Sequence, residues 1–303
     1  MANLRAIRTR IKSVENTRQI TKSMKMVAAA KLRKTQAAFT GLRAFAEESG
    51  RLLAEASAGA AGNENPYLTP RPECKRTCYV LIVGNRGLCG TYNQALLRYC
   101  ENLVRDSGRE SCLIVCGRWG KDLIAAAGLR ADETVEIGDT PTRDEAVALA
   151  EKLKKLYTDG TADEIVLVYQ RYRSVLSQTP GQARLLPLEG GQGGGSSASA
   201  ETTGAGPAAP AGGLIFEPSR ERVIDVLLDM YIDNTVHAAL LEARTGEHSA
   251  RMTAMTAAAD NTEELIGELT LELNHARQTA ITTEISEIAG GAEALRNHSA
   301  GGY

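Results

Sequence analysis

The chain has 303 residues, a formal net charge of −2 and an aromatic content of only 4%. The length allows one large domain or two ordinary ones, and the near-neutral charge argues against a generic polyanion binder. The sequence shows neither an apolar signal region near its start nor an apolar run approaching the roughly 20 residues that span a bilayer, so we expect a cytosolic or membrane-peripheral protein.

The positions of proline divide the sequence. All nine prolines lie between Pro66 and Pro218. Proline breaks helix interiors, so long helices are expected before and after this region, over about 3–57 and 219–288. We therefore predict four parts: an N-terminal coiled-coil helix (1–65), a Rossmann-like α/β domain (66–189), a loop (190–213), and a C-terminal coiled-coil helix with a short tail (214–303).

The N-terminal helix begins with apolar residues spaced by three and four, which is the heptad pattern of a left-handed coiled coil. Arg18 and Lys25 interrupt this pattern, and we expect a neighbouring stripe to replace it. The residues concerned are Leu4, Ile7, Ile11 and Val14, then Ile20, Met24 and Val27, followed by Phe39 and Leu42.

The segment QITKSMKMVAAAKLRK (19–34) contains strong helix formers and five Lys or Arg but no acid. A membrane-surface helix would need bulkier apolar residues. Nucleic acid would suit the basic residues, but the acidic C-terminal helix would repel it. A coiled coil enclosed by an acidic protein surface explains both the small residues and the positive charge.

The middle of the chain alternates between two patterns. Apolar runs that predict strands occupy 78–84, 111–117, 134–138 and 164–173, and helical stretches occupy 91–107, 118–128 and 142–158. Such alternation favours a mostly parallel α/β sheet.

Residues 84–90 form a predicted strand-to-helix turn, and such turns of α/β proteins often bind phosphates. GNRGLCG (84–90) matches neither the dinucleotide pattern nor a P-loop, so we interpret it as a tight turn, with nucleotide binding as the weaker alternative. The sequence suggests no catalytic triad or zinc-protease motif. The six cysteines include two C-x3-C pairs, for which reduced thiols are a simpler interpretation than a metal site or a regulatory disulfide.

Residues 190–213 contain Gly, Ala or Ser at 18 of 24 positions. So few large apolar residues cannot form a core, and the segment is predicted to be a flexible loop.

The C-terminal helix shows the clearest period. Its spacings alternate between three and four from Ile224 to Thr283, and its small residues allow close helix approach. Residues 217–303 contain fifteen Asp or Glu and six Arg, whereas residues 1–45 contain eleven Lys or Arg and one Glu. Opposite charges favour pairing of the two helices. The expected seam includes Ile11, Val14, Met252, Met255, Ala259, Ile266, Leu269, Leu273, Ala276 and Ala280.

Four segments resemble the gamma-subunit family of the F-type ATP synthases. They are IRTRIKSVENTRQITKSMKMVAAAKLRK (7–34), RGLCGTYN (86–93), ARMTAMTAAADN (250–261) and ARQTAITTEISEIAGGAEAL (276–295). The last contains the family signature at Ile281, Thr282, Glu284, Glu287, Gly291, Ala292 and Ala294. The resemblance extends over nearly the whole chain.

The resemblance implies an α/β middle domain with a long antiparallel two-helix left-handed coiled coil. It implies a central rotor shaft that couples ion flow through a membrane ring to ATP synthesis or hydrolysis, without catalysis by the chain itself. The implied partners are the alpha and beta subunits, the epsilon subunit and the c-subunit ring, with no nucleic acid, small-molecule substrate, metal or cofactor. Met24, Lys25, Arg277 and Gln278 are the implied contacts with the surrounding hexamer, and the implied location is the cytoplasmic face of the cell membrane.

Two other classes of protein remain open at this point. One is a nucleotide-binding enzyme built on the middle domain. The other is a free-standing coiled-coil scaffold. Binding of ATP by the isolated chain, or co-purification with alpha and beta subunits, distinguishes them from a shaft.

Overall fold

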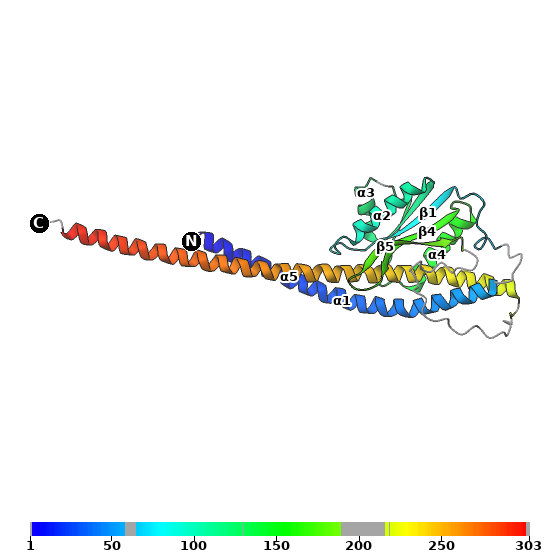
Figure 1. Cartoon of the computed structure of the whole chain (residues 1–303), viewed down its shortest axis with the longest axis horizontal. Coiled ribbons are helices and arrows are strands. Elements are labelled where there is room, and N and C mark those ends of the chain that lie inside the picture. The colour runs from blue at the N-terminus through cyan, green and yellow to red at the C-terminus, as the bar shows by residue number, and fades with distance from the viewer. Residues whose placement is uncertain (1, 58–64, 129, 189–215, 218, 301–303) are drawn as a thin grey trace. The chain divides into compact units, whose positions relative to one another are not determined.

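The computed structural model describes residues 2–57, 65–128, 130–188, 216–217 and 219–300 (Figure 1). The predicted loop at 190–213 lies outside these residues. Two compact units are present, one of residues 28–253 and one of residues 1–27 with 254–303. Both long helices therefore contribute to both units, and the four parts defined by sequence remain a prediction.

A five-stranded sheet forms the centre of the unit at 28–253. Its order is β3-β2-β1-β4-β5, with β5 antiparallel to β4 and the other pairs parallel. The strands are β1 (Arg76–Ile82), β2 (Glu110–Cys116), β3 (Glu133–Val135), β4 (Glu164–Tyr172) and β5 (Gln178–Leu186). The parallel α/β prediction is confirmed for the first four strands.

The sequence did not predict β5. Its sequence, QTPGQARLL, has no apolar run and includes Pro180 and Gly181. Proline is accepted in a strand only at an edge or bulge, and β5 is the edge strand next to β4. The strand therefore depends on pairing with β4 rather than on its own composition.

Three helices connect the parallel strands: α2 (Tyr92–Ser107), α3 (Arg118–Ala126) and α4 (Arg143–Thr158). Gly108 caps the C-terminal end of α2 with a φ of 58°, a conformation that glycine adopts without strain. Helix α4 begins with a capping box, in which Thr142 and Glu145 each bond the other's backbone N–H.

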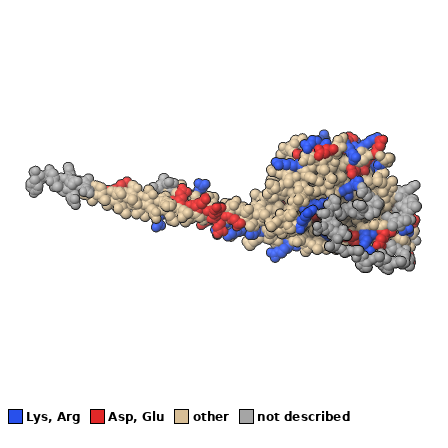
Figure 2. Space-filling view, in the orientation of Figure 1, with Lys and Arg blue, Asp and Glu red and all other residues tan. Residues whose placement is uncertain are grey.

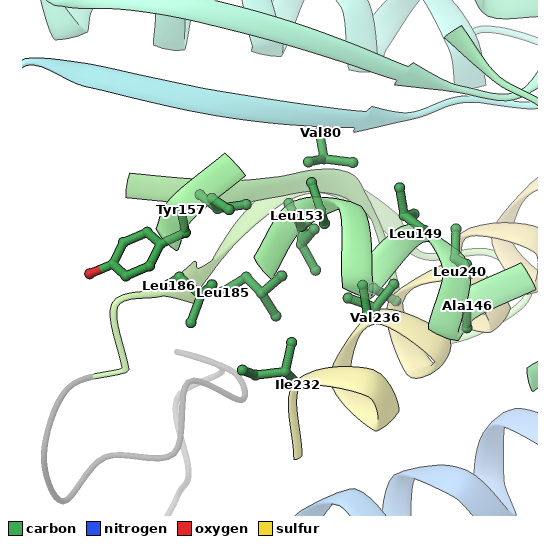
Figure 3. Packing of buried hydrophobic residues seen from close by; sticks show 14 of the residues in the cluster. Val80, Ala146, Leu149, Leu153, Tyr157, Leu185, Leu186, Ile232, Val236 and Leu240 are labelled. Carbon is green, nitrogen blue, oxygen red and sulfur yellow. The ribbon is translucent and has the colours of Figure 1, made fainter. Parts of the chain in front are cut away.

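The sheet is buried on both faces, which explains the nearly continuous apolar runs of its parallel strands. One face packs against α2 and α3, through residues such as Leu96 and Ile124. The other packs against α4 and the long helix α5 (Arg220–Ala300), where Leu149 and Leu153 of α4 lie between Val80 of the sheet and Val236 of α5 (Figure 3). The domain is thus a three-layer sandwich in which α5 supplies part of the core.

Helix α1 (Ala2–Ser57) and α5 are antiparallel in the unit at 28–253. The Arg220 Nε atom donates to the Ala56 carbonyl oxygen at 3.0 Å. An added Cβ on Gly50 would lie 3.1 Å from the Tyr231 ring. Earlier residues of α1 therefore lie beside later residues of α5, which is the antiparallel arrangement predicted from the sequence.

In the unit of residues 1–27 and 254–303, the same helices bury Ile7 on α1 and Met255, Ala259 and Leu269 on α5. Arg18 and Glu263 form an ion pair across the two helices at 3.6 Å. Acidic side chains gather on this helical part of the molecule (Figure 2). The pairing of a basic with an acidic helix agrees with the charge pattern.

The replacement stripe expected on α1 is wrong at Ile20 and Val27, whereas Phe39 is buried and Met24 and Leu42 are half-buried as expected. Ile20 is 59% exposed and Val27 is 56% exposed, whereas Thr21 and Ala28 are buried. The first heptad pattern simply continues, with the half-buried Arg18 as a member. Which side chains are buried on this part of α1 therefore depends more on their position on the helix face than on their hydrophobicity.

Helix α5 continues past the predicted end at 288 and includes Gly290 and Gly291. From Ile281 to Ala292 every residue is exposed, although Ile281, Ile285 and Ile288 are large and apolar. In its own unit, α5 extends beyond the start of α1 (Figure 1). Among the described helices, none is both long enough and apolar enough to cross a membrane.

Candidate functional site

The strand order reverses between the parallel strands β1 and β4, because the chain adds β2 and β3 on one side of β1 and then β4 on the other. The carboxyl ends of β1 and β4 therefore flank a topological switch point. In open α/β sheets this crevice is where ligands usually bind. Here α5 occupies it. The backbone N–H of Tyr172, at the end of β4, donates to the Glu242 carboxylate at 2.8 Å, and the Tyr92 hydroxyl donates to the Ala243 carbonyl oxygen at 2.7 Å.

Arg244 is the centre of this junction and is almost completely buried. Its guanidinium donates to the backbone oxygens of Val83, Ile137 and Gly138 at 2.9, 3.2 and 3.1 Å. It also donates to Asn85 Oδ1 at 2.9 Å and pairs with Glu247 at 2.8 Å. Arginine has five N–H donors, so this geometry gives each of them an acceptor.

Glu247 and Arg251 attach the next turn of α5 to the 84–90 turn. Glu247 Oε1 accepts from Arg251 at 2.6 Å and from the Asn85 N–H at 3.2 Å. Arg251 donates to the backbone oxygens of Arg86 and Gly87 at 3.0 and 3.3 Å. The turn is therefore filled by α5 side chains.

Asp139 connects α1 to this network. Its carboxylate accepts from Lys31 of α1 and, at 3.1 Å, from the Asn85 amide. Its backbone oxygen lies 3.2 Å from Nε2 of the buried His248. We call Lys31, Asn85, Asp139, Arg244, Glu247, His248 and Arg251 the charged junction.

The electrostatics of the charged junction favour ionised carboxylates and a neutral imidazole. Burial opposes ionisation of Glu247, but the guanidiniums of Arg244 and Arg251 outweigh it and lower its pKa. Burial likewise opposes ionisation of Asp139, yet hydrogen bonds from Lys31 and Asn85 hold its pKa well below its usual range. Burial lowers the pKa of His248 and outweighs the opposing Glu247 carboxylate, and the nearby Arg251 adds to the lowering.

This arrangement connects the 84–90 turn to α5. The N–H of Asn85, which a phosphate-binding turn would present to a ligand, donates to Glu247. An added Cβ on Gly84 would lie 3.0 Å from the Glu247 carboxyl carbon, so the turn closes directly on α5. Over the described part of the chain, no three His, Cys, Asp or Glu side chains gather as metal ligands.

The residues singled out by sequence lie elsewhere on the two long helices. Met24 is half-buried, and Lys25, Arg277 and Gln278 are exposed. The seam residues are buried or half-buried throughout, namely Ile11, Val14, Met252, Met255, Ala259, Ile266, Leu269, Leu273, Ala276 and Ala280. The contacts implied for Met24, Lys25, Arg277 and Gln278 remain predictions.

Sequence reasoning missed Arg244, Glu247 and Arg251. A signal existed, because positions 244, 247, 248 and 251 share one helix face and all four carry ionisable residues. Gly246 is a second signal. An added Cβ there would lie 3.3 Å from the Tyr92 ring, which indicates close approach of the helix to the domain.

Comparison with known proteins gives consistent matches. The ATP synthase family model matches residues 3–295. The ATP synthase gamma chain of Heliobacterium modesticaldum is 42% identical over 97% of this chain and all of its own length, and that of Moorella thermoacetica is 42% identical over 98% and all of its own length. A chain from the Euglena gracilis mitochondrial ATP synthase, in an OSCP, F1 and c-ring assembly, aligns with a TM-score of 0.69 at 19% identity, covering all of this chain and 97% of its own length.

Proposed function

The chain belongs to the gamma-chain family of the F-type ATP synthase, whose members form the central stalk, and from this premise we propose how it couples ion flow to ATP synthesis. Its coiled coil stands inside a hexamer of alpha and beta subunits. Its α/β domain, with the epsilon subunit, rests on the c-subunit ring. Rotation of the ring turns the helices within the hexamer.

The observation that supports this proposal best is the exposed apolar end of α5. Ile281, Ile285 and Ile288 are 47%, 61% and 67% exposed, and their spacing places them on one helix face. Soluble proteins seldom leave such a stripe in water unless another protein covers it. The hexamer is the partner that the family supplies.

Contact with the hexamer must change during rotation if the shaft is to transmit free energy. A coupling exists only where the interaction energy differs between orientations. Arg277 and Gln278 are exposed beside the half-buried Ala276, so they face away from α1 and towards a surrounding partner. On α1, Lys25 is exposed and Met24 is half-buried, and we assign all four residues to this contact.

The charged junction gives the shaft a firm connection to its base. Arg244 bonds α5 to the ends of two loops of the domain, and Lys31 bonds α1 to Asp139 of the same region. Torque applied to the domain by the ring would pass through these bonds to both helices. Breaking the buried Arg244–Glu247 pair would cost several kcal/mol, so this connection should persist under load.

We propose further that the chain does not catalyse by itself. The Asn85 N–H and the Arg86 and Gly87 carbonyl oxygens of the 84–90 turn bond to α5, so they are not offered to a nucleotide. Catalysis then belongs to the hexamer. We place the chain as a peripheral subunit on the cytoplasmic face of the cell membrane.

Co-expression with the alpha and beta subunits of the same organism tests this function. A tagged gamma chain should retain both subunits through size-exclusion chromatography, and the assembly should hydrolyse ATP. The isolated chain should show no ATP hydrolysis above background and no ATP binding in equilibrium dialysis. Recovery of the chain without alpha and beta subunits, or turnover by the pure chain, would contradict the proposal.

A further inference from the structure

Two cysteines that are distant in sequence meet in the sheet. Cys78 of β1 and Cys112 of β2 are partners in the parallel register, and their sulfur atoms lie 3.0 Å apart. The C-x3-C spacing suggests other pairs, Cys74 with Cys78 and Cys112 with Cys116. The fold instead joins one cysteine from each motif.

The geometry of this pair allows a covalent bond. Neighbouring strands lie about 4.7–4.9 Å apart, and a disulfide accepts Cα separations of about 4.4–6.8 Å. The sulfur atoms need to approach by roughly 1 Å to reach a bond length of about 2.05 Å.

We propose that Cys78 and Cys112 form a redox-active dithiol that a low-molecular-weight disulfide oxidises to a cross-strand disulfide. The Cys112 thiolate attacks one sulfur of the oxidant and releases one thiolate, leaving a mixed disulfide on Cys112. Cys78 then loses its proton, attacks the Cys112 sulfur and releases the second thiolate. The protein loses two hydrogen atoms, and the oxidant gains them as two thiols.

Cys112 is the sulfur that reacts first. It is half-buried, whereas Cys78 is completely buried. The hydrogen-bonded contact with the Cys78 sulfur lowers the Cys112 pKa, and the Arg76 guanidinium also lowers it, against burial and the Asp132 carboxylate. Arg76 is held on the same strand pair by Glu110, at 2.9 Å. The thiolate is the attacking species, so this environment sets the order of the two steps.

The other cysteines serve as internal comparisons. Cys100 and Cys116 are buried, and burial raises the pKa of each thiol to about 12. Cys74 is half-buried like Cys112, but burial raises its pKa, and its sulfur lies near Thr77 and Arg109 rather than near another sulfur. Cys74 is therefore the matched control, because it is as accessible as Cys112 but has no second cysteine sulfur beside it.

The experiment treats the folded full-length chain with oxidised glutathione and maps its peptides by mass spectrometry without reduction. The expected product is a Cys78–Cys112 linked peptide, two hydrogen atoms lighter than the reduced pair, which dithiothreitol returns to free thiols. Cys78→Ala should instead accumulate glutathione on Cys112, because the second thiol is missing. Cys74→Ser should give the linked peptide at the parent rate.

Oxidation should also raise the melting temperature, by roughly 5 °C for a loop of this size, since the bond restricts the unfolded chain. Cys112→Ser, at a half-buried position, should fold normally and lose this increase. Three results would overturn the proposal: glutathione remaining on Cys112 in the parent chain, a Cys78–Cys112 bond appearing only after denaturation, or faster modification of Cys74 than of Cys112. Each can be observed in the parent protein, so the test stands even if the Cys78→Ala chain fails to fold.

Discussion

At the scale of single residues, the charged junction shows why a buried charge persists in a stalk. Arg244 has an acceptor for every N–H donor, and Glu247 lies between two guanidiniums. A buried ion pair adds little net stability compared with apolar packing, but removal of one partner leaves an uncompensated charge. In this chain the buried ion pairs fix the orientation of α5 on the domain.

Arg244→Ala should therefore destabilise the chain by about 3–5 kcal/mol, because Glu247 and several backbone oxygens lose their donor. Arg130→Ala, at an exposed position in the same unit, should change stability by no more than about 0.5 kcal/mol. Chemical denaturation of the two variants measures the difference. Equal stability of both variants would contradict the structural role given to Arg244.

His248 should make stability depend on pH near neutrality. Its folded pKa is lowered, so below the ordinary value of 6.5 the unfolded chain binds a proton that the folded chain resists. Stability should therefore fall as pH drops from about 7.5 to 5.5. His248→Gln should flatten this slope, whereas His275→Gln, an exposed position on the same helix, should leave it unchanged. Melting temperatures across the pH series provide the measurement.

At the scale of elements, sequence predicted best where a period extends over many turns. Both long helices and four strands were predicted, because an apolar residue every third or fourth position, or a continuous run, determines the element directly. Strand β5 has no such pattern and forms through its neighbour β4. The charged junction was missed for a related reason: the acceptors of Arg244 are backbone oxygens of distant loops, which no local pattern reveals.

Substitution of two isoleucines distinguishes the continued heptad pattern on α1, which includes Ile7, from the replacement stripe predicted from sequence, which includes Ile20. Ile7 is 6% exposed and Ile20 is 59% exposed, and both belong to the same helix and unit. Ile7→Ala should cost about 2 kcal/mol or more, whereas Ile20→Ala should cost at most about 0.5 kcal/mol. Hydrogen exchange of peptides from residues 4–27 measures both. Faster exchange for Ile20→Ala than for Ile7→Ala would restore the stripe predicted from sequence.

At the scale of the whole molecule, the contacts with the hexamer decide whether the stalk couples. Helix α5 is buried against the domain at Arg244 and exposed from Ile281 to Ala292, so one continuous helix contains both a buried segment and an exposed apolar segment. Arg277 lies between these regions. An Arg side chain presents a planar fork of donors that suits a carboxylate, and Gln278 adds a donor and an acceptor.

Arg277→Ala should leave folding and assembly with the alpha and beta subunits nearly intact, because substitution of an exposed residue usually costs within about 0.5 kcal/mol. It should nevertheless slow ion-driven ATP synthesis by the assembled complex, since a contact that forms only in some rotary positions would be lost. Arg130→Ala, an exposed arginine of the α/β domain, removes the same charge and should retain the parent rate. Synthesis measured in vesicles with equal amounts of assembled complex separates coupling from assembly. If the Arg277→Ala complex assembles and synthesises ATP at the parent rate, Arg277 does not contribute to the coupling contact.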